Sequence, residues 1–222
     1  LYESKKSISY PRTDSRHLSH DVAKNLDSIC DKLSGRYEGN IHPSTGGPLG
    51  KRFVDDAQVT DHHAIIPTGV NPGALSADQE KVFDLICRRF FMAWHDNYEY
   101  GSSKVVLCCG PVHKFVARGK RLIQLGWKVL EGYGKGEKDK LLPEYLKEHL
   151  DLSEFALNCP QKQTQAPPRL TEASLLTAME TAGRQVEDKE LSLAMKERGL
   201  GTPATRSTVS YTHLRAHETR HD

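Results

Sequence analysis

The spacing of apolar residues changes at Gly101, and this change constrains the fold more than any other feature of the sequence. Before it, residues 20–34 and 77–93 place apolar side chains at helical intervals. After it come short β-prone runs, SSKVVLCC, HKFVAR and KRLIQLGW, separated by Gly-Pro and Arg-Gly-Lys turns. We therefore expect a mixed α+β, multi-domain fragment with a mainly helical first part, a β-rich second part containing a small antiparallel unit, and a third part of short helices.

Capping residues define the starts of both early helices. Ser19 is a candidate N-cap for the helix over residues 20–34. Ser76 and Gln79 have the spacing of a capping box at the start of the helix over residues 77–93. In that second helix we expect one apolar stripe, made of Val82, Leu85, Ile86 and Phe90.

The third part is predicted to form short helices, because it has clear start and stop signals. Thr171 is a good N-cap, Gly183 a plausible stop, and residues 187–198 form another short helix. Thr202 as N-cap, with Pro203 at the first helical position, predicts one further helix start.

Composition places the chain in the water-soluble globular class. Of its 222 residues, 37% are hydrophobic and 27% charged, and no apolar run approaches the ~20 residues of a membrane span. The net charge of +2 does not by itself indicate a nucleic-acid partner, but basic residues gather at residues 114–121. That cluster is either a solvated hairpin face or a contact surface. The five cysteines form no C-x-x-C pair, which fits reduced thiols better than a disulfide framework or a zinc site.

The segment around Tyr10 holds a candidate nucleophile. A phenol has a pKa near ~10, so it attacks well only when cations and hydrogen bonds stabilise the phenolate. Pro11 disfavours a helical backbone at Tyr10, and in an extended segment Tyr10 and Arg12 point to the same side. The two could then address one phosphate, the phenol as attacker and the guanidinium as a bidentate clamp. The alternative is ordinary packing plus a surface charge.

The segment TDHHAIIPT, residues 60–68, places two adjacent histidines before an apolar turn. A histidine can donate to a phosphate oxygen, and as a cation it can stabilise a phosphoryl transition state. The alternative is one core histidine and one exposed histidine. A zinc site is not expected, because no cysteine or third histidine lies at ligand spacing.

A third candidate segment, GLGTPATR at residues 199–206, is a glycine-rich turn that leads into a helix start. Backbone N–H groups and the helix dipole at such a start favour an anion. Thr202, Thr205 and Arg206 add two hydroxyls and a charge. One helix start means little alone, but three phosphate-compatible segments in one chain favour phosphate chemistry.

Together these segments resemble the type IA DNA topoisomerases, and among them the topoisomerase III branch. ISYPRTDSRHL is similar to the family's active-site segment and TDHHAIIPT to its histidine segment. PPRLTEASLLTAME and RGLGTPATR resemble a later segment that lies against the bound single strand. The order matches as well, and the similarity runs over nearly all of residues 1–207.

The resemblance implies an ATP-independent isomerase that changes DNA topology by relaxation or decatenation. Tyr10 would attack a DNA phosphorus and become linked to the 5′ phosphate, releasing a 3′ hydroxyl that reverses the attack after strand passage. Arg12 would clamp the scissile phosphate, and His62 would hydrogen-bond to it or to a neighbour. The DNA-binding residues that the resemblance implies are Thr13, Asp14, His63, Thr202, Thr205 and Arg206.

In the family, a Toprim domain precedes the tyrosine and holds the Mg²⁺ ligands and a glutamate that works in acid/base steps. No part of this sequence matches it. We therefore expect Mg²⁺ as the cofactor of the whole enzyme, no metal ligand in this fragment, and no efficient DNA cleavage by the fragment alone. The resemblance further implies that the protein binds single-stranded DNA, is a monomer and does not enter membranes. It implies a cytoplasmic, nucleoid-associated location. A helicase is a possible partner of the whole enzyme.

Mapped onto the family, residues 1–100 are the catalytic tyrosine domain, 101–165 part of the strand-passage arch, and 166–206 part of the base domain with a DNA-contacting helix start. We expect residues 207–222 to be a non-native tail. VSYTHLRAHET can be back-translated into a string that resembles a transposase adapter used in preparing sequencing libraries. An ordinary terminal tail is the alternative.

Two other classes of protein remain open. A non-catalytic single-stranded nucleic-acid-binding module would use WHDNYEY and the basic hairpin for stacking and charge, but it leaves Tyr-Pro-Arg unexplained. A tyrosine recombinase places its arginines and histidines before the nucleophile, whereas His62 follows Tyr10 here.

Overall fold

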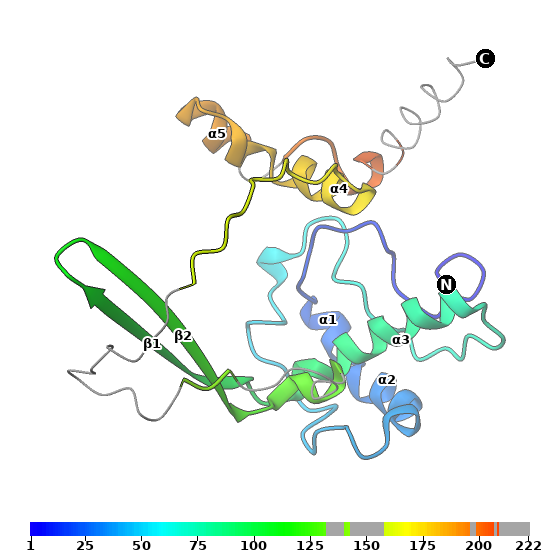
Figure 1. Ribbon diagram of the computed structural model, residues 1–222. Helices are drawn as coiled ribbons and strands as arrows, with labels where there is room; N and C mark the ends of the chain where they lie inside the picture. The colour runs from blue at the N-terminus through cyan, green and yellow to red at the C-terminus, as the bar shows by residue number, and fades with distance from the viewer. Residues whose placement is uncertain (132–139, 143–157, 196–198, 207, 209–222) are drawn as a thin grey trace. The chain divides into compact units, whose positions relative to one another are not determined.

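The chain divides into two compact units. The computed structural model describes residues 1–131, 140–142, 158–195, 199–206 and 208 (Figure 1). Unit 1 comprises residues 1–11 and 15–156, and unit 2 comprises residues 12–14 and 157–222. Tyr10 and His62 therefore belong to unit 1, whereas Arg12 belongs to unit 2.

The described residues contain helices and one antiparallel sheet, which confirms a mixed α and β composition. Unit 1 contains α1 (His20–Ala23), α2 (Leu26–Leu33), η1 (Ser34–Tyr37), η2 (Asp56–Gln58), α3 (Ala77–Phe91), η3 (Met92–Trp94), β1 (Glu99–Cys109), β2 (His113–Gln124) and η4 (Gly126–Glu131). Unit 2 contains α4 (Glu172–Glu180), η5 (Ala182–Gln185), α5 (Lys189–Met195) and a helical turn at residues 203–206. The predicted boundaries of the tyrosine, arch and base domains stay predictions. None of the described helices is long and apolar enough to cross a membrane.

The predicted helix over residues 20–34 forms with a break at Asn25. Ser19 is the N-cap of α1, as predicted, and its hydroxyl accepts a hydrogen bond from the Val22 amide at 3.3 Å. Asn25 leaves helical geometry (φ −108°, ψ 6°) and precedes α2 as its N-cap residue, a position that asparagine favours. The continuous helix is therefore wrong. α2 buries Leu26, Cys30 and Leu33 at helical spacing.

α3 confirms the second predicted helix and part of its apolar stripe. The Ser76 hydroxyl accepts from the Gln79 amide at 3.3 Å, and the Gln79 side chain accepts from the Ser76 amide at 3.0 Å, so the capping box is present. Val82 and Leu85, expected in the stripe, are 48% and 55% exposed. The stripe is therefore wrong at these two positions, whereas Phe90 is buried and Ile86 packs against the core, as predicted. The helix turns its aromatic side chains inward because they offer more apolar area to bury. The buried positions of α3 are Phe83, Cys87, Phe90 and Phe91.

Polar groups in the core of unit 1 find partners across long sequence distances. The Tyr37 hydroxyl donates to the Asp84 carboxylate at 2.8 Å. Trp94 Nε1 donates to the Gly47 carbonyl at 2.8 Å, which fixes a glycine-rich loop against the end of α3. Burial raises the pKa of the Cys87 thiol to about 11. Four of the cysteines are free thiols, as predicted: Cys30, Cys87, Cys108 and Cys159.

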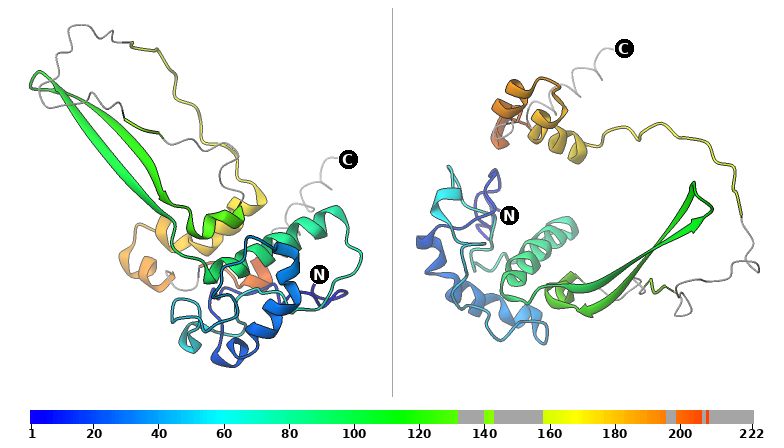
Figure 2. Two further views of the ribbon diagram at one scale, coloured as in Figure 1. Left: turned by 90° about the horizontal axis from the view of Figure 1, so that it is seen from below. Right: turned by 90° about the vertical axis from the view of Figure 1, so that its left-hand side faces the viewer.

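β1 and β2 form one antiparallel ribbon (Figure 1, Figure 2). The predicted turn at Arg-Gly-Lys is wrong, because β2 runs straight through Gly119. Gly119 instead permits a close approach: a Cβ there would lie 3.0 Å from the Lys140 carbonyl oxygen and 2.9 Å from a Leu142 side-chain carbon. The Lys120 amide donates to that same Lys140 carbonyl at 2.7 Å.

Unit 2 follows the predicted capping signals. The Thr171 hydroxyl accepts from the Ser174 amide at 3.2 Å and starts α4. α4 ends at Glu180, before the predicted stop at Gly183, because Thr181 leaves helical geometry (φ −104°, ψ 18°). α5 occupies part of the helix predicted at residues 187–198, of which residues 196–198 lie outside the described residues.

Candidate active site

Two segments singled out in the sequence, residues 7–10 and 62–68, lie side by side in unit 1. Ile8 and Pro67 form an antiparallel bridge, so the backbone that leads to Tyr10 is extended, as predicted. Two backbone hydrogen bonds flank the bridge: the Ser9 amide donates to the Ile66 carbonyl at 2.9 Å, and the Thr68 amide donates to the Ser7 carbonyl at 3.0 Å.

The Ser9 side chain joins the same segments a second time. Its hydroxyl accepts from the Ile66 amide at 2.9 Å and donates to the Ala64 carbonyl at 3.2 Å. Ile8 and Ile66 are both buried in the core. The segment pair is thus anchored by apolar burial and by polar contacts, which sets the relative position of the side chains that flank it.

The rings of Tyr10 and His62 are in contact. Their centroids lie 4.3 Å apart, and their planes are tilted by 47°. Tyr10 is half-buried and His62 is exposed, so a ligand can reach the pair from solvent. The structure therefore brings together the two residues to which the sequence analysis assigned nucleophilic attack and phosphate hydrogen bonding.

A third ring, Tyr2, was not predicted at this site. Its centroid lies 5.3 Å from that of Tyr10, with the planes at 78°. A turn places it there: the Lys6 amide donates to the Tyr2 carbonyl at 3.1 Å, and Lys6 takes a positive φ of 53°. No glycine, proline or asparagine marks this turn in the sequence, so the pattern gave no signal. Tyr2 is consequently a neighbouring phenol that could compete with Tyr10.

His63 occupies a different environment from His62. It is half-buried, and its Nδ1 lies 2.7 Å from the Ala64 carbonyl, to which it must donate because that oxygen can only accept. This bond holds the His63 ring along its own backbone. Its predicted DNA contact stays a prediction.

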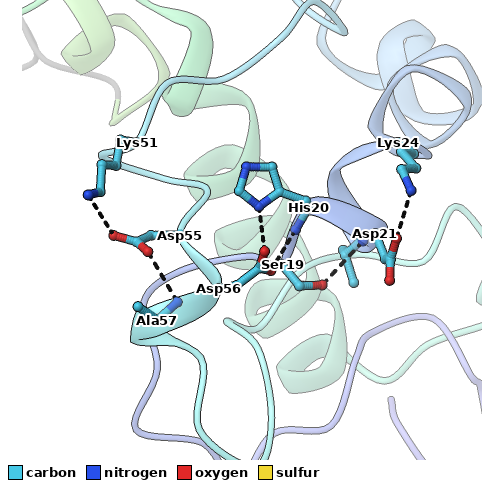
Figure 3. Close-up of polar contacts among 9 residues, drawn as sticks. Ser19, His20, Asp21, Lys24, Lys51, Asp55, Asp56 and Ala57 are labelled. Atoms are coloured by element: carbon cyan, nitrogen blue, oxygen red, sulfur yellow. Dashed lines mark hydrogen bonds and ion pairs between the residues drawn. The ribbon is translucent and has the colours of Figure 1, made fainter.

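The chain that leaves the Tyr10 segment is held by the stretch before the histidines (Figure 3). Leu18 bridges Val54 in parallel fashion. Asp56 accepts from the His20 amide at 2.9 Å, and its other carboxylate oxygen lies 2.6 Å from His20 Nδ1. These hydrogen bonds from the His20 amide and ring lower the pKa of the Asp56 carboxyl. The sequence pattern does not predict this pair, since its members are far apart in the chain.

In unit 2, the helical turn predicted from Thr202 and Pro203 is present at residues 203–206. The Thr205 hydroxyl accepts from the Thr202 amide at 2.9 Å, and both threonines are exposed. Gly199 has a φ of 60°, and a Cβ there would lie 2.5 Å from the Glu180 carbonyl oxygen. Glycine is therefore required where the chain returns to the end of α4.

Arg206 is buried, with only 7% of its surface exposed. Its Nη1 donates to the Asp14 carboxylate at 3.2 Å. It also donates to two carbonyls of the turn before it, from Nε to Leu200 at 2.9 Å and from Nη2 to Gly201 at 3.1 Å. Arg206 and Asp14, both predicted to bind DNA, thus contact each other within unit 2. Arg12 is exposed and Thr13 half-buried.

The described residues do not fit a Mg²⁺ ion. Within the part of the chain that the structure describes, no group of three or more His, Cys, Asp or Glu side chains could hold a metal. The expectation that Mg²⁺ ligands lie in a Toprim domain stays a prediction.

Comparison with known proteins gives consistent matches. A family model described as DNA topoisomerase matches residues 1–215. DNA topoisomerase 3 of Bacillus licheniformis is 39% identical over 225 residues, which covers 94% of this chain and 30% of that protein. DNA topoisomerase 3 of Bacillus subtilis (strain 168) is 37% identical over 227 residues, with the same coverage of 94% and 30%. The chain therefore spans less than a third of the length of these relatives.

The family match includes part of the predicted non-native tail. It runs to residue 215, whereas the tail was predicted at residues 207–222. Of that stretch, residues 207 and 209–222 lie outside the described residues. The tail stays a prediction.

Proposed function

Because the chain belongs to the type IA DNA topoisomerase family, we propose that it supplies the nucleophile with which such an enzyme opens one DNA strand. The observation that carries this proposal is the contact between Tyr10 and His62, whose ring centroids are 4.3 Å apart. It joins a nucleophile and a hydrogen-bond donor from two separate motifs at a point that solvent reaches. One phosphate can contact both groups there.

The reaction is a phosphoryl transfer between two oxygens. The Tyr10 hydroxyl oxygen attacks the phosphorus, a bond forms between them, and the bond from phosphorus to the 3′ oxygen breaks. The phenol loses one proton and the departing 3′ oxygen gains one, so the products are a 5′-phosphotyrosine and a 3′ hydroxyl. His62 donates to a non-bridging phosphate oxygen and stabilises the charge that develops there. Attack by the 3′ hydroxyl reverses every step, and no ATP is needed.

The remaining site residues have supporting roles in the proposal. Arg12 is exposed and two positions from the nucleophile, which suits a clamp on the scissile phosphate. Thr202 and Thr205 offer exposed hydroxyls to the strand backbone. Thr13, Asp14 and His63 are further DNA-binding residues in the proposal. Arg206 holds Asp14 and the turn before it in place for DNA binding.

The proposal for the whole enzyme includes a cofactor, a substrate and partners. We place its Mg²⁺ requirement in the Toprim domain of the family, and no step above depends on the ion. The substrate is DNA with a single-stranded stretch, and relaxation or decatenation follows from strand passage. We further propose a monomer in the cytoplasm, associated with the nucleoid, with a helicase as an additional partner.

The test is covalent trapping in a chimera. The matching segment of Bacillus licheniformis DNA topoisomerase 3 is replaced by this chain and mixed with a single-stranded oligonucleotide and Mg²⁺. Because the tyrosine takes the 5′ phosphate, a label on the 3′ end of the oligonucleotide should move with the protein on a denaturing gel. A label on the 5′ end should leave on a shortened strand.

Tyr10→Phe should abolish the adduct in the chimera while DNA binding stays, and Tyr2→Phe is the matched control that should keep it. The chain alone should give no efficient cleavage. An adduct that survives Tyr10→Phe would contradict the proposal. The alternative, a non-catalytic nucleic-acid-binding module, predicts binding but no adduct from any of these proteins.

A further inference from the structure

One face of the β1–β2 hairpin is basic. Residues that face each other across an antiparallel pair share a side of the sheet, and successive residues along a strand alternate. Lys104 lies opposite Arg118, and Ser102 lies opposite Lys120. The four cations of this side, which we call the basic face, are Lys104, Lys114, Arg118 and Lys120. Within these two described strands the only carboxylate is Glu99, at the end of β1.

The opposite face of the hairpin is mainly apolar. Val105 lies opposite Ala117, and Leu107 opposite Phe115, so apolar side chains dominate there. Gly119 on this side is approached by Leu142. Arg121 is the only lysine or arginine of this face within the two described strands. The charge of the hairpin is therefore sorted onto one side rather than spread over both.

Aromatic rings lie at one end of the basic face. Tyr100 shares this face with Lys120, whose Nζ lies 4.5 Å from the Tyr100 ring centroid and 5.0 Å from that of Tyr98. Tyr98 lies 5.5 Å from Tyr100 and 6.4 Å from Trp127 between centroids. Lys128 Nζ is 4.4 Å from the Tyr98 centroid. We call the rings of Tyr98, Tyr100 and Trp127 the aromatic end.

Most of the basic face and the Tyr100 ring are open to a ligand, whereas Lys120, Tyr98 and Trp127 are half-buried. Lys104, Lys114 and Arg118 are exposed, and Tyr100 is 50% exposed. Side chains two positions apart on a strand are roughly 7 Å apart, the spacing of Arg118 and Lys120, and Lys104 lies opposite Arg118. Lys114 extends this row toward the hairpin turn, beyond Val116. A row of cations that ends in stacking rings is the combination by which proteins bind single-stranded nucleic acid: phosphates contact the cations, and unpaired bases stack on the rings.

We propose that the basic face and the aromatic end together bind single-stranded DNA, with the phosphates along Lys104, Lys114, Arg118 and Lys120 and an unpaired base on Tyr100. The choice of DNA rests on the proposed function, whereas the surface itself includes neither Tyr10 nor His62. This proposal gives a role to two sequence features, WHDNYEY and the basic hairpin, that have no part in the proposed cleavage site.

The charge part is tested by salt dependence. Binding of a fluorescent oligothymidylate to the 222-residue chain is measured by anisotropy over a range of salt concentrations. Log affinity falls as log salt rises. Lys104→Gln and Arg118→Gln should each make this slope less negative by about 0.7, the value for one phosphate contact on a single strand. Arg121→Gln is the matched control, since it removes the same charge from the opposite face, and it should leave the slope unchanged. An equal loss for Arg121→Gln, or no loss for either basic-face variant, would overturn the proposal.

The stacking part is tested at Tyr100. Tyr100→Leu should weaken oligothymidylate binding by roughly five-fold or more, whereas Tyr100→Phe should keep it, because a phenyl ring stacks as well. Affinity for a duplex of the same length should respond less to Tyr100→Leu. An equal loss on duplex DNA, or an equal loss for Leu and Phe, would overturn the assignment of an unpaired base. These binding measurements do not depend on cleavage, so failure of the adduct test leaves them interpretable, and the reverse holds as well.

Discussion

The Ser9 hydroxyl accepts a hydrogen bond from the Ile66 amide at 2.9 Å, and the Ser9 amide donates to the Ile66 carbonyl at the same 2.9 Å. Both backbone polar groups of Ile66 are thus satisfied by one residue, which stands next to Tyr10 in the chain. The pairing sets the distance between the nucleophile segment and the histidine segment. Side-chain contact between Tyr10 and His62 follows from this local arrangement.

Removal of the Ser9 hydroxyl should destabilise unit 1. Ser9→Ala leaves the amide of the buried Ile66 without its acceptor, which costs about 1–3 kcal/mol in the free energy of unfolding. Urea unfolding of the chain measures this loss. Ser34→Ala is the control, because its hydroxyl only donates to the Asp31 carbonyl at an exposed helix end and should change stability little. Equal stability of the two variants would contradict the role given to Ser9.

His62 should matter for adduct formation much more than His63. His62→Ala removes the donor to the phosphate and should lower the rate of adduct formation in the chimera by roughly 100-fold, as loss of one transition-state donor does. His63→Gln should have a smaller effect, because the His63 ring bonds to the Ala64 carbonyl. Rates are read from the time course on denaturing gels. A larger loss for His63→Gln would reverse the assignment of the two histidines.

Stability should fall on mild acidification because of His95. Burial, together with the positive charge that His42 can carry, lowers the pKa of His95 below its usual value near ~6.5. A lowered pKa means that the stabilising contribution is complete above the unfolded-state pKa and is lost as the pH falls through the folded-state value. We therefore expect the urea midpoint to drop as the pH falls below the unfolded-state value near ~6.5.

The variant His95→Asn should flatten that decline, and the exposed His113→Asn should not. Among the described side chains, Nε2 of His95 is buried without a hydrogen-bond partner, so no polar contact of that atom is lost in the variant. An acid response that is unchanged in His95→Asn would show that another group causes it.

Arg206→Lys should loosen the turn at residues 199–206. The lysine cannot reproduce the fork that contacts the Leu200 carbonyl, the Gly201 carbonyl and Asp14. The Leu200 amide, which donates to the Met179 carbonyl at 2.8 Å, should exchange its hydrogen faster. The exposed Arg169→Lys is the control for the same chemical change. Unaltered exchange at Leu200 in Arg206→Lys would contradict this structural role.

Local signals predicted the helix starts, because a cap depends on residues within one turn. Ser19, Ser76 and Thr171 all accept the backbone hydrogen bonds expected of them. The buried stripe of α3 and the turn at Gly119 are set by partners far along the chain, which periodicity does not contain. The predicted turn is accordingly wrong, and the stripe is wrong at Val82 and Leu85.

The site was predicted in parts. Tyr10 and His62 could be paired only through the family resemblance, since no local pattern relates positions so far apart. Tyr2 was missed because the turn that carries it past Tyr10 contains no glycine, proline or asparagine. The ion pair between Arg206 and Asp14 was missed for the same reason as the α3 stripe: its partners are distant in sequence.

The central claim is that Tyr10, rather than the adjacent Tyr2, takes the phosphate. Trypsin separates them, since Tyr2 falls in the peptide that ends at Lys5 and Tyr10 in that of residues 7–12. After the chimera has reacted with the oligonucleotide, nuclease and trypsin digestion followed by mass spectrometry should find a nucleotide on the tyrosine of peptide 7–12. A nucleotide on the peptide that ends at Lys5, or on neither peptide when an adduct is present on the gel, would contradict the account.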